Sequence, residues 1–209
     1  PSFNLIGRRD LGRGQWLVIS TPRSGWFTCA GERGPGVAVW MMLADWVSRS
    51  NPPVDLAFVC NSGHEYENLG AQHMLDTAAP APDRTRLWLH LGANVAARDW
   101  HELGGRLAPL PSADPQRFLM ASSELIPACG AAFSGLPGLE APYALGGGAS
   151  GELAHIAAAG YRRVVGIFGA HRLHHAATDD MRCIETKPVE AVFLAVRRLL
   201  EQRGILTSV

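Results

Sequence analysis

Residues 164–180 read VVGIFGAHRLHHAATDD. The first five residues form a continuous apolar run, which predicts a strand buried on both of its faces. Three histidines, His171, His174 and His175, follow within five residues of one another, and Asp179 comes four positions after His175. Histidine is the commonest metal ligand in proteins and titrates near neutral pH. The stretch therefore predicts a metal or proton-transfer site at the carboxyl end of a buried strand.

Three more apolar runs predict strands of the same kind. They lie at 16–20 (WLVIS), 54–60 (VDLAFVC) and 87–91 (LWLHL). Apolar residues at helical spacing predict helices at 36–47 and 189–200, and Asp114-Pro115 predicts the start of a third at 114–126. Strands that alternate with helices indicate an α/β three-layer sandwich with a mostly parallel, mixed central sheet. We expect a single domain over 1–209, with a Gly- and Pro-rich surface loop at 136–151.

The bulk composition excludes several classes of partner. The chain has 209 residues, of which 47% are hydrophobic, and its 19 basic and 19 acidic residues give a net charge of zero. We therefore expect no nucleic-acid or anionic-membrane partner. No apolar run approaches the roughly 20 residues that span a bilayer, and the first residues do not resemble a signal peptide. Composition leaves the compartment and the oligomeric state open.

The four cysteines, Cys29, Cys60, Cys129 and Cys183, are widely spaced and contain no CxxC pair. This spacing argues against a zinc ribbon. We expect buried free thiols, although the spacing alone does not exclude a disulfide.

Acids and histidines follow three of the four predicted strands. Glu32 comes after the first strand, His64 and Glu65 after the second, and His175 after the last. The carboxyl ends of parallel strands share one rim of the sheet, where ligands gather in α/β proteins. Two carboxylates and one imidazole are a reasonable ligand set for a zinc ion that keeps one position open for water.

Each of these residues also has a structural interpretation. Glu32 in its Gly-rich segment is equally consistent with a solvated charge, and residues 62–65 with a simple turn before a helix. His175 with Asp179 also fits a structural hydrogen-bonded pair, and His171 and His174 fit surface or neighbouring groups. Residues 26–27 (Trp-Phe) suit either a lid over the core or the wall of a pocket.

The order of these segments resembles the zinc aminopeptidase and glutaminyl cyclase superfamily, metallopeptidase family 28. Residues 4–6 (NLI) resemble its "NVI" strand, 32–38 (ERGPGVA) its Asp-containing loop, and 63–70 (GHEYENLG) its "EExGLxG" motif. Residues 160–165 (GYRRVV) resemble "aGiPav", and 175–179 (HAATD) resemble "HTxxD". The resemblance covers about residues 4–200 and implies a zinc-peptidase-like fold. Family members carry further elements before the "NVI" strand, so the resemblance also predicts that this chain is truncated at its start.

The resemblance implies a zinc site with several departures. Metal ligands map onto Glu32, which replaces an Asp, and onto Glu65 and His175, while His64 takes the place of the general-base Glu. Two further ligands of two-zinc members fall on Thr21 and Gly92 and are lost. We therefore expect one zinc ion or none. Arg23, two residues after Thr21, is expected to place a fixed cation at the vacated site.

Three functions are consistent with these residues. The first is a zinc aminopeptidase-like domain with a degenerate metal site and doubtful peptidase activity. The second is an active mononuclear zinc hydrolase or glutaminyl-cyclase-like acyltransferase, with His64 as general base. The third is a non-catalytic module that binds a peptide, a small molecule or a partner. A serine esterase is disfavoured because no GxSxG motif is present.

Overall fold

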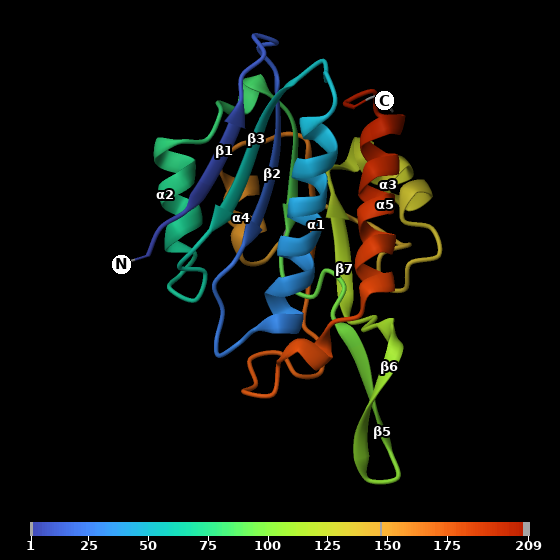
Figure 1. Cartoon of the computed structure of the whole chain (residues 1–209). Helices are drawn as coiled ribbons and strands as arrows, with labels where there is room; N and C mark the ends of the chain where they lie inside the picture. Colours follow the sequence, from blue (N-terminus) through green and yellow to red (C-terminus); the bar gives the residue numbers. More distant parts are fainter. Residues whose placement is uncertain (1, 147, 207–209) are drawn as a thin grey trace.

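The computed structural model describes residues 2–146 and 148–206. Its centre is a seven-stranded sheet in the order β1-β3-β2-β4-β9-β7-β8 (Figure 1). Strands β3, β2, β4 and β9 are mutually parallel, whereas β1 and β7 run antiparallel to their neighbours β3 and β9. The strands are β1 (Leu5–Arg9), β2 (Trp16–Pro22), β3 (Asp55–Asn61), β4 (Thr85–Leu91), β7 (Arg117–Ala121), β8 (Tyr143–Ala144) and β9 (Val164–Gly169).

Helices cover both faces of this sheet. One face packs against α1 (Ala30–Ser48), α3 (Ile126–Ala132) and α5 (Thr186–Gln202), and the other against α2 (Leu69–Thr77) and α4 (Glu152–Ala158) (Figure 1). Successive residues of a strand point to opposite faces, so Leu17 and Ile19 enter the α1–α5 core and Val18 enters the α2–α4 core. The predicted α/β sandwich with a mostly parallel, mixed sheet is therefore confirmed, and the four apolar runs form β2, β3, β4 and β9.

Helix α1 begins at Ala30, six residues before the start that its periodicity predicts. Its early start has a long-range cause, because the carboxylate of Asp179 accepts hydrogen bonds from the backbone N–H groups of Gly31 and Glu32. The first N–H groups of a helix have no partner within the helix, so an acceptor placed there stabilises the first turn. The Gly-rich segment is thus helical, and Glu32 lies in the first turn.

The predicted helix at 114–126 is wrong. Residues 117–121 form strand β7, which pairs with β9 along its whole length, and helix α3 begins only at Ile126. Asp114 does accept the N–H of Gln116, but it closes a turn that leads into a strand. Pairing with the buried strand β9 outweighs the local helical spacing of Phe118, Leu119 and Ser122.

A hairpin that the apolar runs did not predict projects from the sheet. Strands β5 (Arg98–Leu103) and β6 (Arg106–Ala113) pair only with each other and extend away from the body (Figure 1). Gly104 and Gly105 form its turn, both with positive φ, as two-residue hairpin turns require.

The described residues also show the state of the cysteines and of the Gly- and Pro-rich segment. All four cysteines are free, as expected, and three of them are buried. The segment 136–151 is mostly irregular apart from β8, and its residue 147 lies outside the described part. Among the described residues, no helix combines the length and apolar character needed to cross a bilayer.

Candidate metal centre

Three of the predicted site residues meet at the carboxyl rim of the sheet. His175 Nε2 lies 3.4 Å from Glu32 Oε1 and 3.8 Å from Glu65 Oε2. The three side chains come from the segment after β9, the first turn of α1 and the loop between β3 and α2. His174 Nε2 also approaches Glu32 Oε1, at 3.9 Å. The fold therefore collects two carboxylates and two imidazoles from segments far apart in the sequence.

Glu32 is a buried carboxylate that lacks hydrogen-bond donors. Its side chain is 1% exposed, and neither of its oxygens accepts a hydrogen bond from a described residue. Burial raises the pKa of this carboxyl, and the nearby charges of Arg33 and His175 only partly offset that rise. The interpretation of Glu32 as a solvated charge is therefore wrong. A buried carboxylate in this state favours a cation as its partner.

Arg33 places a fixed positive charge between the two carboxylates. Its Nη2 lies 2.7 Å from Glu32 Oε1, as an ion pair that is not aligned for a hydrogen bond, and donates to Glu65 Oε1 at 3.0 Å. Its Nε donates to the Ser24 carbonyl, and the residue is 3% exposed. The sequence offered no sign of this role, because a charge in a Gly-rich segment usually faces water.

The expectation for Arg23 is wrong. Its guanidinium lies over the ring of Phe3, 4.7 Å from the centroid, and donates to the Phe3 carbonyl at 2.6 Å. Arg23 follows β2 directly and leans towards the N-terminal residues, whereas Arg33 is carried into the centre by the first turn of α1. The centre does contain an arginine, but a different one.

The two histidines at the centre are stacked on each other. The rings of His174 and His175 lie 4.1 Å apart, and His175 has a left-handed backbone with φ of 60°. Such a backbone is unusual outside glycine and is often found at functional sites. Burial, with the neighbouring histidines, lowers the pKa of His174 to about 4, so this ring is neutral at pH 7. A neutral imidazole is the form that binds metals, and His174 therefore joins the candidate ligands.

Asp179 and His171 form a buried pair next to the candidate centre. Their side chains are buried, and His171 Nε2 lies 3.2 Å from Asp179 Oδ2. The pKa of Asp179 is lowered, because hydrogen bonds from His171 and from the N–H groups of Gly31 and Glu32 outweigh the opposing effect of burial. Asp179 therefore pairs with His171 and not with His175. Of the two positions expected for His171, at the surface or beside the ligands, the structure shows the second. Asp179 instead ties the histidine segment to the helix that carries Glu32.

His64 lies next to a buried acid that the sequence did not reveal. Its Nδ1 is 3.4 Å from Glu152 Oε1, and Glu152 Oε2 accepts a hydrogen bond from Asn61 Nδ2 at 2.8 Å. Glu152 begins helix α4 after the Gly-rich loop and is 1% exposed. Burial alone would raise its pKa, but the hydrogen bond from His64, nearby His90 and Asn61 together lower it. Glu152 therefore orients His64 as a carboxylate partner.

The positions of the two lost ligands are closed by packing. Thr21 is buried, and its hydroxyl donates to the Leu91 carbonyl at 2.8 Å. A Cβ at Gly92 would lie 2.8 Å from the Ile167 carbonyl oxygen, so no ligating side chain fits there without movement. Because neither position can supply a ligand, the residues present favour fewer zinc ions than the two of a two-zinc site.

The side chains present fit one zinc ion. Zinc bonds to N and O are about 2.0–2.2 Å long, so two ligand atoms of a tetrahedral site lie roughly 3.3 Å apart. The separations of 3.4 and 3.8 Å from His175 Nε2 to the two carboxylates approach that value. Ligand atoms of Glu32, His174 and His175 also lie within 4.8 Å of one another. The buried oxygens of Glu32, which accept no hydrogen bond from a described residue, complete the fit.

Comparison with known proteins places the fold. No protein-family model and no curated protein sequence matches the chain. Among solved structures it is similar to a zinc aminopeptidase from Bacillus subtilis, with 13% identity and a TM-score of 0.71 over 96% of this chain and 49% of that one. The Porphyromonas gingivalis glutaminyl cyclase gives 15% identity and 0.71 over 96% and 76%.

A leucine aminopeptidase precursor from Bacteroides thetaiotaomicron gives 13% identity and a TM-score of 0.71, over 99% of this chain and 77% of that chain. The chain thus spans about half the length of the Bacillus enzyme and about three quarters of the other two. It therefore has the fold of the zinc aminopeptidases and glutaminyl cyclases, the superfamily that its motifs resemble.

Proposed function

We propose that this chain is a one-zinc hydrolase domain that acts on an amide bond of a peptide or small molecule. The observation that carries the proposal is the approach of His175 Nε2 to Glu32 Oε1 and Glu65 Oε2, at 3.4 and 3.8 Å. Glu32, Glu65 and His175 would hold the ion, with His174 beside them. A zinc ion in such a site polarises a carbonyl and lowers the pKa of water.

Arg33 supports one ion rather than two. Two carboxylates and one guanidinium leave one net negative charge at the centre. A divalent ion held by these carboxylates would be repelled by the neighbouring guanidinium. The two carboxylates offset that repulsion for a first ion. A second ion would meet the repulsion of Arg33 and of the first ion together.

His64 is the residue proposed to move the proton. Glu152 holds its Nδ1 side at 3.4 Å, and Ser24 Oγ accepts its backbone N–H at 3.0 Å. A carboxylate on one ring nitrogen fixes the tautomer and leaves the other nitrogen free to accept a proton. His64 then removes a proton from the attacking water, and Glu152 stabilises the charged ring.

A second candidate is a module that binds an amide ligand without turnover. The contact of Arg33 with both carboxylates favours it, because the guanidinium already supplies part of the charge that an ion would supply. In this case Glu32, Glu65 and Arg33 form a fixed charged cluster that recognises a polar ligand.

Turnover separates the two candidates. Purified protein with one equivalent of zinc would be assayed on aminoacyl-anilides and on glutaminyl peptides. We expect measurable release that falls about 100-fold or more in His64→Ala and is lost in Glu65→Ala. Glu67→Ala, at an exposed acid of the same loop, is the matched control and should leave the rate unchanged. Zinc-loaded protein with no turnover of either class favours the binding module.

A further inference from the structure

A groove lies beside the candidate metal centre, between β1 and helix α2. Its volume is about 800 Å³, and its apolar lining consists of Phe3, Ile6, Trp26, Tyr66, Leu69 and Met74. We call this the α2 groove. Most of these side chains are substantially exposed, Tyr66 by 72% and Leu69 by 63%. A pocket of this size and lining is typical of sites for drug-sized ligands.

Several polar side chains of the groove already have partners. Asn4 Nδ2 donates to the Gly70 carbonyl at 2.8 Å, and Asn4 Oδ1 accepts the N–H of Ser62 at 3.0 Å. The hydroxyls of Ser2 and Ser62 bond to each other. With these side chains paired, the groove presents mainly the carbon atoms of its six apolar residues, which favours a hydrocarbon.

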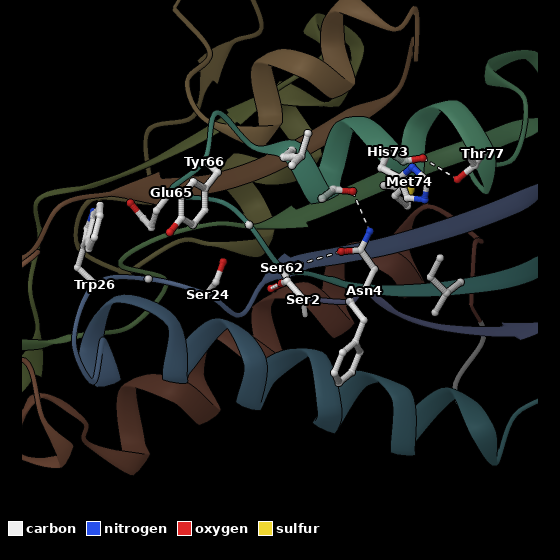
Figure 2. Close-up of a pocket in the computed structure, with 16 residues that line it drawn as sticks. Ser2, Asn4, Ser24, Trp26, Ser62, Glu65, Tyr66, His73, Met74 and Thr77 are labelled. Carbon is white, nitrogen blue, oxygen red and sulfur yellow. Dashed lines mark hydrogen bonds between the residues drawn. The ribbon is translucent and has the colours of Figure 1, made fainter.

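The groove is elongated along α2. Its lining residues on this helix lie on one face, from Leu69 through His73 to Thr77, which is the whole length of the helix. Nine residues at 1.5 Å each give a length of about 13 Å. Trp26, Glu65 and Tyr66 lie at one end and His73 and Thr77 at the other (Figure 2).

One end of the groove opens at the candidate centre. Glu65 lines the groove, and its Oε2 lies 3.8 Å from His175 Nε2. We propose that the α2 groove binds a medium-length acyl chain of an N-acyl amide, with the amide N–H facing Glu65 and the chain along α2. The identity of this ligand as a substrate rests on the proposed function, whereas its binding does not.

Chain-length dependence of binding tests the proposal directly. N-decanoylglycinamide and N-acetylglycinamide would be titrated into the full chain by calorimetry, with EDTA and with zinc. Each buried methylene strengthens binding about fourfold, so we expect the decanoyl amide to bind at least about 100-fold more tightly under both conditions. Leu69→Asp should weaken decanoyl binding at least about tenfold, whereas Leu194→Asp, at an exposed leucine of α5, should not.

Equal affinity for the two amides would overturn the proposal, as would unchanged decanoyl binding in a folded Leu69→Asp protein. A wild-type dimer that Leu69→Asp converts to a monomer would also overturn it, because a second copy would then occupy the groove. Chain-length dependence in EDTA without any turnover would leave the groove assignment standing and the hydrolase proposal refuted. Turnover of short amides without chain-length dependence would refute the groove assignment and support the hydrolase proposal.

Discussion

Arg33 donates a hydrogen bond to Glu65 across the candidate centre, with 3.0 Å between Nη2 and Oε1, while the other oxygen of Glu65 faces His175. Glu65 therefore uses one oxygen for a fixed cation and leaves the other for an ion. The same carboxylate therefore contributes both to the stability of the metal-free protein and to the binding of a metal ion.

Removal of the guanidinium should separate these two effects. Arg33→Met leaves Glu32 and Glu65 buried without their cation, and loss of one partner of a buried ion pair costs about 3–5 kcal/mol. In EDTA, we expect Arg33→Met to have an unfolding free energy lower by about 3–5 kcal/mol, measured by urea denaturation. We also expect its zinc-induced rise in Tm to be larger than that of the wild type. Arg23→Met is the matched control and should leave the zinc-induced rise unchanged. A smaller rise in Arg33→Met than in the wild type would show that Arg33 helps to hold the ion.

Glu32 should destabilise the metal-free protein at neutral pH. Its pKa is raised by burial, so the folded state holds its proton to a higher pH than the unfolded chain does. Stability therefore falls as the pH rises above the unfolded value, and the loss is complete above the raised pKa. Glu32→Gln is therefore expected to raise Tm in EDTA at pH 8, to have less effect at pH 5, and to abolish the zinc-induced rise in Tm. A fall in Tm at pH 8 would contradict this assignment.

Asp55 provides a pH-dependent contribution far from the centre. It is 1% exposed, and its carboxylate accepts backbone N–H groups of Leu11, Arg13 and Gly14. Burial opposes ionisation, but these bonds outweigh it and lower the pKa. An aspartate with a lowered pKa adds stability above its unfolded value of about 3.9 and loses it as the pH falls through the folded value.

Asp55→Asn should thus cost on the order of 2 kcal/mol at pH 7, from weaker hydrogen bonds to the three N–H groups. The gap between mutant and wild type should shrink below pH 4, as urea denaturation at several pH values would show. Asp76→Asn, at an exposed position of α2, is the control. A gap that is constant with pH would rule out a charge effect.

The sheet was predictable because its central strands are buried on both faces. A continuous apolar run as short as 16–20 is typical of a strand that is covered on both sides, and the four such runs form β2, β3, β4 and β9. Strand β7 was missed because Asp114-Pro115 and the helical spacing after it are local signals, whereas its pairing with β9 is not. The β5–β6 hairpin had a usable signal in Gly104-Gly105 between two short segments.

The candidate centre was predictable only in part. Glu32, Glu65 and His175 follow strand ends, and the carboxyl ends of parallel strands meet at one rim. Arg33 and Glu152 were missed because their roles depend on contacts that span 32 and 88 residues of sequence, to Glu65 and His64 respectively. The hydrogen bonds from the first turn of α1 to Asp179 join residues that lie 147 or more positions apart, so no local sequence pattern indicates them.

The assignment of Glu32, Glu65 and His175 as metal ligands is tested by zinc binding. Metal-free protein would be titrated with zinc by calorimetry at pH 7.5, beside His175→Ala and the exposed-histidine control His101→Ala. We expect one equivalent of zinc per chain in the wild type and in His101→Ala, and a loss of that binding in His175→Ala. No bound zinc in the wild type, or an equal amount in His175→Ala, would contradict the assignment.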